Sequence, residues 1–386
     1  MTCALRVPFM NDPVRPPDAP ERVAQTQRDL RWLATSPWLL ARAAPDGQYA
    51  GDARPAAGAS PASDDAILPP LADWPAHLVP VLQHWLASPD GAASVPPVVA
   101  APKRLGRYAE LLLGGMLAHL PGVQVLAANL PIRRMAGQGN GVDTLGELDF
   151  VWRDLASGLV IHWELATKFY LLIPEPDLAA SITWMHFVGP NLADRFGDKL
   201  SHIATRQLPL SRIPEARAAL GCNVDRAEAY LKGWLFYPLE RPGVRRSGRL
   251  PTCLATDHLN GWWGTLGQFA DGLPGDVDGL RWCLLPRALW LSPARLDTGS
   301  DGLLEHADMV SALYQRFHSG SEAPAYRRTI PVMICGLRRE TDGAGRNGWY
   351  ETTRGFIVPD GWTALALRRA HGERVEPGWQ MDGKGG

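Results

Sequence analysis

The sequence predicts an α/β protein with a core at residues 103–240, a helical N-terminal lobe and a mixed C-terminal region. Two observations predict the core. Residues 105–120 contain no proline and are apolar on nearly every side, which is typical of a helix buried between two layers. Further along, residues 147–153 and 159–172 are strand-like and flank Ala156-Ser157-Gly158, so they predict a β-hairpin with a short glycine turn.

The N-terminal lobe, residues 1–102, is predicted to be helical. Apolar residues recur with a helical period in residues 22–43, and Pro37 should interrupt that helix. Ala, Pro, Gly, Asp and Ser dominate residues 44–70, so we expect a disordered-looking surface loop there. A second, short helix is expected at residues 76–87, and the proline-rich residues 90–102 close the lobe.

The core begins in the order helix, strand, strand, strand. Outside the hairpin, its predicted elements are a short strand at 123–128, a glycine-rich loop at 136–146, a helix at 192–207 and a buried strand at 233–238. The C-terminal region, residues 241–386, combines Pro/Gly loops with a tryptophan-rich tract. Its candidate strands lie at 281–291, 329–337 and 348–358.

Composition excludes several classes of protein. With 386 residues, of which 46% are hydrophobic, the chain is neither disordered nor fibrous. Its 40 acidic residues balance 39 Lys and Arg, so any contact with nucleic acid or an anionic membrane must use a local basic patch. The basic residues are 34 Arg and only five Lys, so clustered arginines are weak evidence whereas each lysine is informative.

Cysteine usage and hydropathy predict a cytoplasmic protein. The five cysteines are odd in number and far apart, so neither a zinc site nor a disulfide framework is expected, and we predict reduced thiols. The first residues lack the pattern of a signal peptide, and no uncharged apolar run is long enough to span a membrane.

One predicted strand carries unusual charges. Because strand side chains alternate between faces, His162, Glu164, Ala166 and Lys168 share one face of residues 159–172, and Trp163, Leu165, Thr167 and Phe169 share the other. Burying an unpaired carboxylate or ammonium in such an apolar strand would cost several kcal/mol. Both charges therefore need partners.

The preceding strand offers one. Glu147 and Asp149 share a face, and hairpin pairing can bring Asp149 close to Glu164. Two carboxylates held together repel each other at neutral pH unless a proton or a cation lies between them. Mg2+ or Mn2+, which prefer oxygen ligands, would satisfy such a pair and serve phosphate chemistry.

These residues resemble a known family. The buried-helix Glu110, the strand Asp149, and then Glu164 and Lys168 on the next strand resemble the PD-(D/E)xK nuclease superfamily, whose restriction-endonuclease-like core is this helix–strand–strand–strand unit. More narrowly, the chain resembles the bacterial DUF1853 family. The strings that carry this resemblance are LGRYAELLL (105–113), GELDFVW (146–152), HWELATKFYL (162–171), GPNLADRFGDKL (189–200), GWLFYP (233–238) and HLNGWW (258–263).

The resemblance implies a site. Asp149 and Glu164 would be metal ligands, with the Leu165 carbonyl as a third, and Glu110 would bind through water or a second metal. The chain departs from the superfamily pattern in one place, because the usual lysine position is Ala166. Lys168 lies on the same face about 6.6 Å further along and could reach back to a water near the metal, where it would orient that water or stabilise developing negative charge as a catalytic residue. Lys199 or Gln207 on the following helix could instead replace the missing lysine.

Each candidate has a structural alternative. Asp149, Glu164 and Lys168 could form a buried ion-pair cluster, and Glu110 could simply pair with Arg107. A single histidine such as His162 is more often hydrogen-bonded than metal-binding. Three polar residues of the helix could form an ordinary solvated face: Asp194, Lys199 and Gln207.

The expected function is Mg2+- or Mn2+-dependent hydrolysis of DNA or RNA. The alternative is a catalytically inactive nuclease fold that binds nucleic acid or a protein, and Ala166 favours it. Tryptophans could stack on bases, although most should lie in the core. The arginines that could contact phosphates are Arg133, Arg134, Arg241, Arg245, Arg246 and Arg249.

Overall fold

A computed structural model gives the three-dimensional structure of the chain. It describes residues 19–41, 68–88, 91–95, 104–135, 142–174, 182–239, 250–273, 279–300, 302–318, 329–343 and 345–375. Most of the predicted loop at 44–70, the start of the predicted glycine-rich loop and four of the predicted phosphate-binding arginines, Arg241, Arg245, Arg246 and Arg249, lie outside the described residues.

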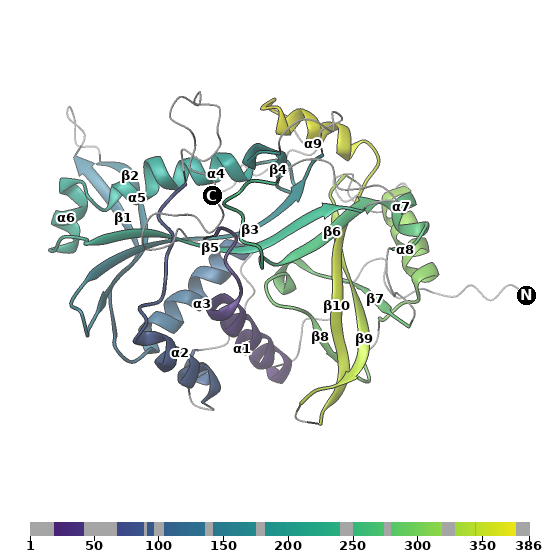
Figure 1. Cartoon of the computed structure of the whole chain (residues 1–386), viewed down its shortest axis with the longest axis horizontal. Helices are drawn as coiled ribbons and strands as arrows, with labels where there is room; N and C mark the ends of the chain where they lie inside the picture. Colours follow the sequence, from purple (N-terminus) through teal and green to yellow (C-terminus); the bar gives the residue numbers. More distant parts are fainter. Residues whose placement is uncertain are drawn as a thin grey trace, which may run out of the picture.

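A large mixed sheet organises the molecule (Figure 1). Its ten strands include a continuous path in the order β1-β2-β3-β5-β6-β10-β9-β7, with β4 pairing to β3 and β8 to β10. The predicted α/β class is confirmed. The strands are β1 (Val123–Met135), β2 (Val142–Asp154), β3 (Val160–Leu172), β4 (Phe187–Val188), β5 (Arg226–Pro238), β6 (Asn260–Thr265), β7 (Arg281–Leu284), β8 (Arg295–Asp297), β9 (Val332–Thr341) and β10 (Asn347–Val358).

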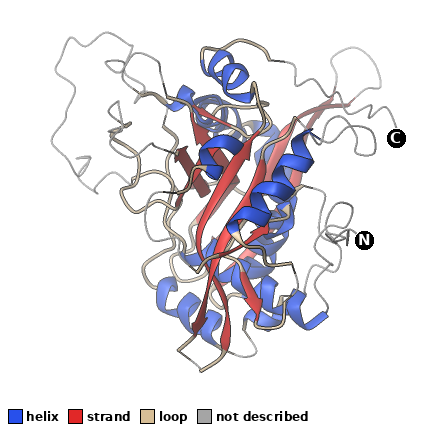
Figure 2. Ribbon diagram, turned by 90° about the vertical axis from the view of Figure 1, so that its right-hand side faces the viewer, coloured by secondary structure: helices blue, strands red, loops and turns tan. Residues whose placement is uncertain are grey.

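Helices cover both faces of this sheet. In Figure 1, α1, α2 and α3 lie below β3 and β5, and α4 and α5 lie above them. The helices are α1 (Ala19–Thr35), α2 (Leu78–Ala87), α3 (Leu105–His119), α4 (Phe196–His202), α5 (Leu208–Leu210), α6 (Pro214–Leu220), α7 (Leu266–Ala270), α8 (His306–His318) and α9 (Trp362–Ala370). Figure 2 shows the twisted strands from the side, with helices lying against them.

Several predicted boundaries were too short. β1 runs to Met135 rather than to residue 128, because β1 and β2 continue as a paired ribbon whose outer residues are exposed and carry no apolar alternation. β5 begins at Arg226 rather than at residue 233. Its extra residues include Glu228 and Lys232, which are buried although charged and so obscured the strand.

Other boundaries were too long. The helix predicted for residues 22–43 ends at Thr35, just before Ser36-Pro37, as the proline required. The strand predicted for 281–291 ends at Leu284, and residues 287–289 form a 3-10 turn after Pro286. The predicted helix at 192–207 begins only at Phe196 and changes its winding at Ile203.

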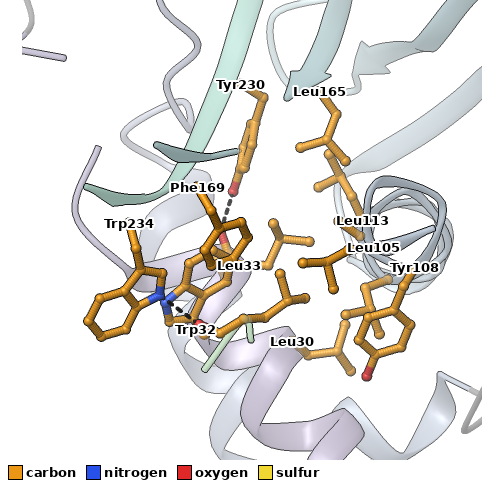
Figure 3. Packing of buried hydrophobic residues seen from close by; sticks show 14 of the residues in the cluster. Leu30, Trp32, Leu33, Leu105, Tyr108, Leu113, Leu165, Phe169, Tyr230 and Trp234 are labelled. Atoms are coloured by element: carbon orange, nitrogen blue, oxygen red, sulfur yellow. Dashed lines mark hydrogen bonds between the residues drawn. The ribbon is translucent and has the colours of Figure 1, made fainter. Parts of the chain in front are cut away.

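The main core lies between the sheet and the lower helices. Apolar side chains of α1 and α3 meet Leu165, Phe169, Tyr230 and Trp234 of the strands (Figure 3). Tryptophans contribute to this core, as predicted: the Trp163 ring packs edge-on against Trp152 and Trp74, each at 4.9 Å between ring centroids. This packing fixes one face of the sheet, and the candidate site lies on the other face.

A buried carboxylate connects α1 to two distant segments. Asp29 has no exposed surface, and it accepts hydrogen bonds from the Tyr108 hydroxyl of α3 at 2.8 Å and the Ser292 hydroxyl at 2.6 Å. Gln25 donates a further bond at 2.9 Å. The Tyr108 and Ser292 hydroxyls hold α1 against both α3 and the C-terminal region.

Candidate functional site

The site begins where β2 and β3 stop pairing. Their ladder runs from Arg153 and Val160 to Phe150 and Trp163, and the next residues along the two strands are Asp149 and Glu164. There the Asp149 carboxylate takes the place of a backbone acceptor, since its Oδ2 accepts the Leu165 N–H at 2.9 Å. The side chain of Asp149 is thereby fixed against β3.

Glu164 lies on β3 with only 1% of its surface exposed. His162, on the same face, approaches Glu164 Oε1 with its Nε2 at 3.0 Å. Burial lowers the pKa of His162 to about 4, so the imidazole is neutral, and Nε2 carries the hydrogen when Glu164 is ionised. His162 is therefore hydrogen-bonded, as the structural alternative predicted.

The two carboxylates perturb each other. Burial, followed by the charge of Glu164, raises the pKa of Asp149 to about 7. Burial also raises the pKa of Glu164 to about 7, against the opposing effects of Lys199 and of hydrogen bonds with Asp149. Near neutral pH the pair therefore holds a proton that a cation could replace.

The remaining polar groups come from the helical segment of residues 196–210, which combines α4, a π-helical turn and α5. Gln207 donates from Nε2 to Glu164 Oε2, and its Oε1 accepts a 2.8 Å hydrogen bond from Lys199 Nζ. Burial, with the nearby charge of Lys168, lowers the pKa of Lys199. The polar face of this helix thus points at the sheet, and the prediction of a solvated face is wrong for Lys199 and Gln207.

A change of helical winding positions Gln207. Residues 203–207 form a π-helical turn, in which Leu208 N–H bonds to Ile203 O, before Pro209 in the short α5. Wider π turns rotate the following side chains relative to an α-helix and occur often at functional sites. This turn brings Gln207 within hydrogen-bonding distance of both Lys199 and Glu164.

Lys168 points elsewhere. Its Nζ forms a 2.7 Å ion pair with Asp194 Oδ2, which also accepts the Tyr170 hydroxyl at 3.1 Å. The predicted cluster of Asp149, Glu164 and Lys168 is thus not formed through direct contacts. Lys168 nevertheless lies close enough to influence the pKa of Lys199.

Glu110 lies at the margin of the site. Arg107 bonds to its Oε2 at 2.7 Å and also to Asn129 at 2.6 Å, as expected for the structural alternative. The charge of Glu110 still contributes to the raised pKa of Asp149. Among the described residues, no group of three or more His, Cys, Asp or Glu side chains is arranged to hold a metal ion.

A comparison with known protein families covers most of the chain. A family model described as a domain of unknown function, DUF1853, matches residues 28–358. The chain belongs to the DUF1853 family. No curated protein and no solved structure matches this DUF1853 chain. Within the described residues of this DUF1853 protein, no helix is long and apolar enough to cross a bilayer.

The structure adds little support for the predicted phosphate-binding role of the arginines. Arg134 forms an ion pair with Glu215 of α6, in which the Arg134 side chain is exposed and the Glu215 side chain is half-buried. Asp194, predicted to lie on a solvated helix face, is instead the partner of Lys168.

The informative sequence signal for the site of this DUF1853 protein was the scarcity of lysine, because two of its five lysines, Lys168 and Lys199, lie in this region.

Proposed function

We propose that this DUF1853 protein is a divalent-metal-dependent nuclease of the PD-(D/E)xK type, which hydrolyses phosphodiester bonds of DNA or RNA. The observation that carries the proposal is the meeting of Asp149 and Glu164 where β2 and β3 part, with Lys199 held nearby through Gln207. The uninterrupted order α3, β1, β2 and β3 supports a restriction-endonuclease-like core.

The carboxylate pair suits a hard cation. Replacing the shared proton with Mg2+ or Mn2+ would remove the repulsion between Asp149 and Glu164, and both ions favour oxygen ligands. Asp149 and Glu164 would hold the ion, with the Leu165 carbonyl as a further predicted ligand. A bound ion supplies charge that polarises a phosphate and lowers the pKa of a coordinated water.

The protein's own residues then have distinct roles. Lys199 places a positive charge beside the carboxylates, where it would stabilise negative charge developing on the phosphate. Gln207 orients Lys199 and Glu164 together, because it bonds to both. His162 fixes the other oxygen of Glu164. Lys168 is paired with Asp194, so we assign the role of the superfamily lysine to Lys199.

The test uses the full chain with single- and double-stranded DNA and RNA oligonucleotides, in Mg2+, Mn2+ or EDTA. We expect metal-dependent cleavage that falls roughly 100-fold or more in Glu164→Gln, because one charged ligand is lost. Glu228→Gln is the matched control. Glu228 of β5 is also buried and is the register partner of Trp163 of β3. It accepts a 3.0 Å hydrogen bond from the Trp163 indole, on the face of the sheet opposite to Glu164.

The alternative makes a different prediction. A catalytically inactive nuclease fold that binds nucleic acid or a protein would be consistent with Ala166 at the usual lysine position. If the protein binds Mn2+ and oligonucleotides without cutting them, this binding function replaces the proposed activity. Failure to bind either metal or nucleic acid would contradict the nucleic-acid functions altogether.

A further inference from the structure

Two cysteines face each other at the far end of the sheet. Cys283 of β7 is the direct register partner of Cys335 of β9, and their sulfur atoms lie 3.3 Å apart as free thiols. Opposed residues of antiparallel strands have Cα atoms about 4.5–5.5 Å apart. Disulfides span Cα separations of about 4.4–6.8 Å, so a bond between these sulfurs requires no rearrangement of the strands.

The two thiols differ in access to solvent. Cys335 has no exposed surface, whereas Cys283 is partly exposed on β7, the terminal strand of the sheet path. The contact with Cys283, together with burial, raises the pKa of Cys335. Cys335 therefore keeps its proton, and an oxidant from solvent meets Cys283 first.

We propose that Cys283 and Cys335 form an oxidant-sensitive thiol pair that closes to a reversible disulfide between β7 and β9. Hydrogen peroxide is the simplest oxidant for this step. The Cys283 thiolate would attack a peroxide oxygen and become a sulfenic acid, releasing hydroxide. The Cys335 sulfur would then attack the Cys283 sulfur, so that the S–S bond forms and the S–O bond breaks. In total, two thiols lose two electrons and two protons, and the peroxide becomes two molecules of water.

The pair lies next to a buried junction. Both Glu351 and Arg354 are near enough to act on the Cys335 thiol, and these two residues form an ion pair within β10. Arg354 also donates to the Ser292 carbonyl at 2.8 Å, and the Ser292 hydroxyl bonds to Asp29 of α1. A disulfide would therefore hold the terminal strand beside the contacts that join the C-terminal region to α1.

The experiment treats the native full chain with peroxide and counts free thiols after denaturation. The count should fall from five to three and return to five with dithiothreitol. Without reduction, trypsin should release WCLLPR (282–287) linked to TIPVMICGLR (329–338), lighter than the two free peptides by two hydrogen atoms. The melting temperature of the oxidised protein should rise by roughly 5 °C.

Cys283→Ser and Cys335→Ala should abolish the linked peptide and the rise in melting temperature, and Cys222→Ser should change neither. Cys283→Ser affects a partly exposed position, so it remains informative if the buried Cys335→Ala variant does not fold. The proposal is overturned if oxidation stops at a sulfinic acid on Cys283, if no thiols are lost, or if the linked peptides contain other cysteines.

Discussion

Gln207 connects Lys199 to Glu164: it accepts a hydrogen bond from the lysine through Oε1 and donates one to the carboxylate through Nε2. An amide can do both at once, whereas a carboxylate or an ammonium cannot. The Gln207 side chain thus links the helix above the sheet to a buried carboxylate of β3 through two hydrogen bonds.

Glu164→Gln should stabilise the metal-free protein at pH 8. Burial raises the pKa of Glu164 in the folded state to about 7, above its unfolded value. The stability from its bound proton is present below the unfolded pKa and lost as pH rises through about 7. Because an amide does not ionise, we expect a gain of about 1–3 kcal/mol in the free energy of unfolding at pH 8. Urea unfolding in EDTA at pH 8 and pH 5 measures it; an equal gain at both pH values would contradict the assignment.

Binding of Mn2+ should weaken as the pH falls through about 7. Protons compete with the metal for Asp149 and Glu164, whose pKa values are both raised to about 7. From pH 8 to pH 6 we expect the Kd for Mn2+ to increase roughly tenfold or more. Calorimetric titration of the wild type at several pH values tests this, with Glu164→Gln as the variant that should bind weakly throughout. A Kd independent of pH would place the metal elsewhere.

Lys199→Ala should reduce nuclease activity more than Lys168→Ala. Lys199 acts on both carboxylates, whereas Lys168 is engaged by Asp194. We expect a decrease of roughly 100-fold for Lys199→Ala and less than about tenfold for Lys168→Ala. The decisive readout is the rate of oligonucleotide cleavage at saturating Mg2+. If Lys168→Ala reduced the cleavage rate more than Lys199→Ala, the catalytic lysine would be Lys168 of β3.

Gln207→Met should show how much the fixed orientation of Lys199 contributes to activity, apart from its positive charge. Methionine retains a similar length but bonds to neither Lys199 nor Glu164, so Lys199 keeps its charge and loses its fixed position. We expect the cleavage rate constant to fall about 10–100-fold while the melting temperature changes little. Circular dichroism supplies the structural control. An unchanged cleavage rate would exclude a positioning role for Gln207.

Gly233→Ala should destabilise the sheet next to the site. A Cβ at this position would lie 1.8 Å from the Lys168 carbonyl oxygen on the neighbouring strand, with φ at +155°. The clash involves backbone atoms, so we expect a loss of about 3 kcal/mol or more in the free energy of unfolding. Gly221→Ala is the matched control, because Gly221 has a positive φ but open space around it, and should cost about 1 kcal/mol.

The face of each residue on β3 could be predicted because strand alternation is a local property. Glu164 and His162 do share a face, and Asp149 does meet Glu164 at the end of the β2–β3 ladder. The route from Lys199 to Glu164 could not be predicted from an ideal helix. It depends on the π turn at residues 203–207, which no periodicity in the sequence indicates.

Contacts between distant segments could not be predicted from the sequence either. The sequence marked Lys168 as a charge needing a partner, but nothing in its neighbourhood identified Asp194, 26 residues later, as that partner. In β5, Lys232 is buried under the ring of Trp38, which lies 3.7 Å from its Nζ, so a charged residue occupies a position that patterning reserves for apolar ones. Tertiary partners decided both positions.

The contacts of Asp29 also order events during synthesis on the ribosome. Helix α1 is synthesised before both of these partners, because Tyr108 lies 79 residues further along the chain and Ser292 lies 263 residues further. The buried carboxylate cannot gain its full set of donors until residue 292 has been translated. A nascent chain that stops before residue 292 therefore leaves α1 incompletely docked.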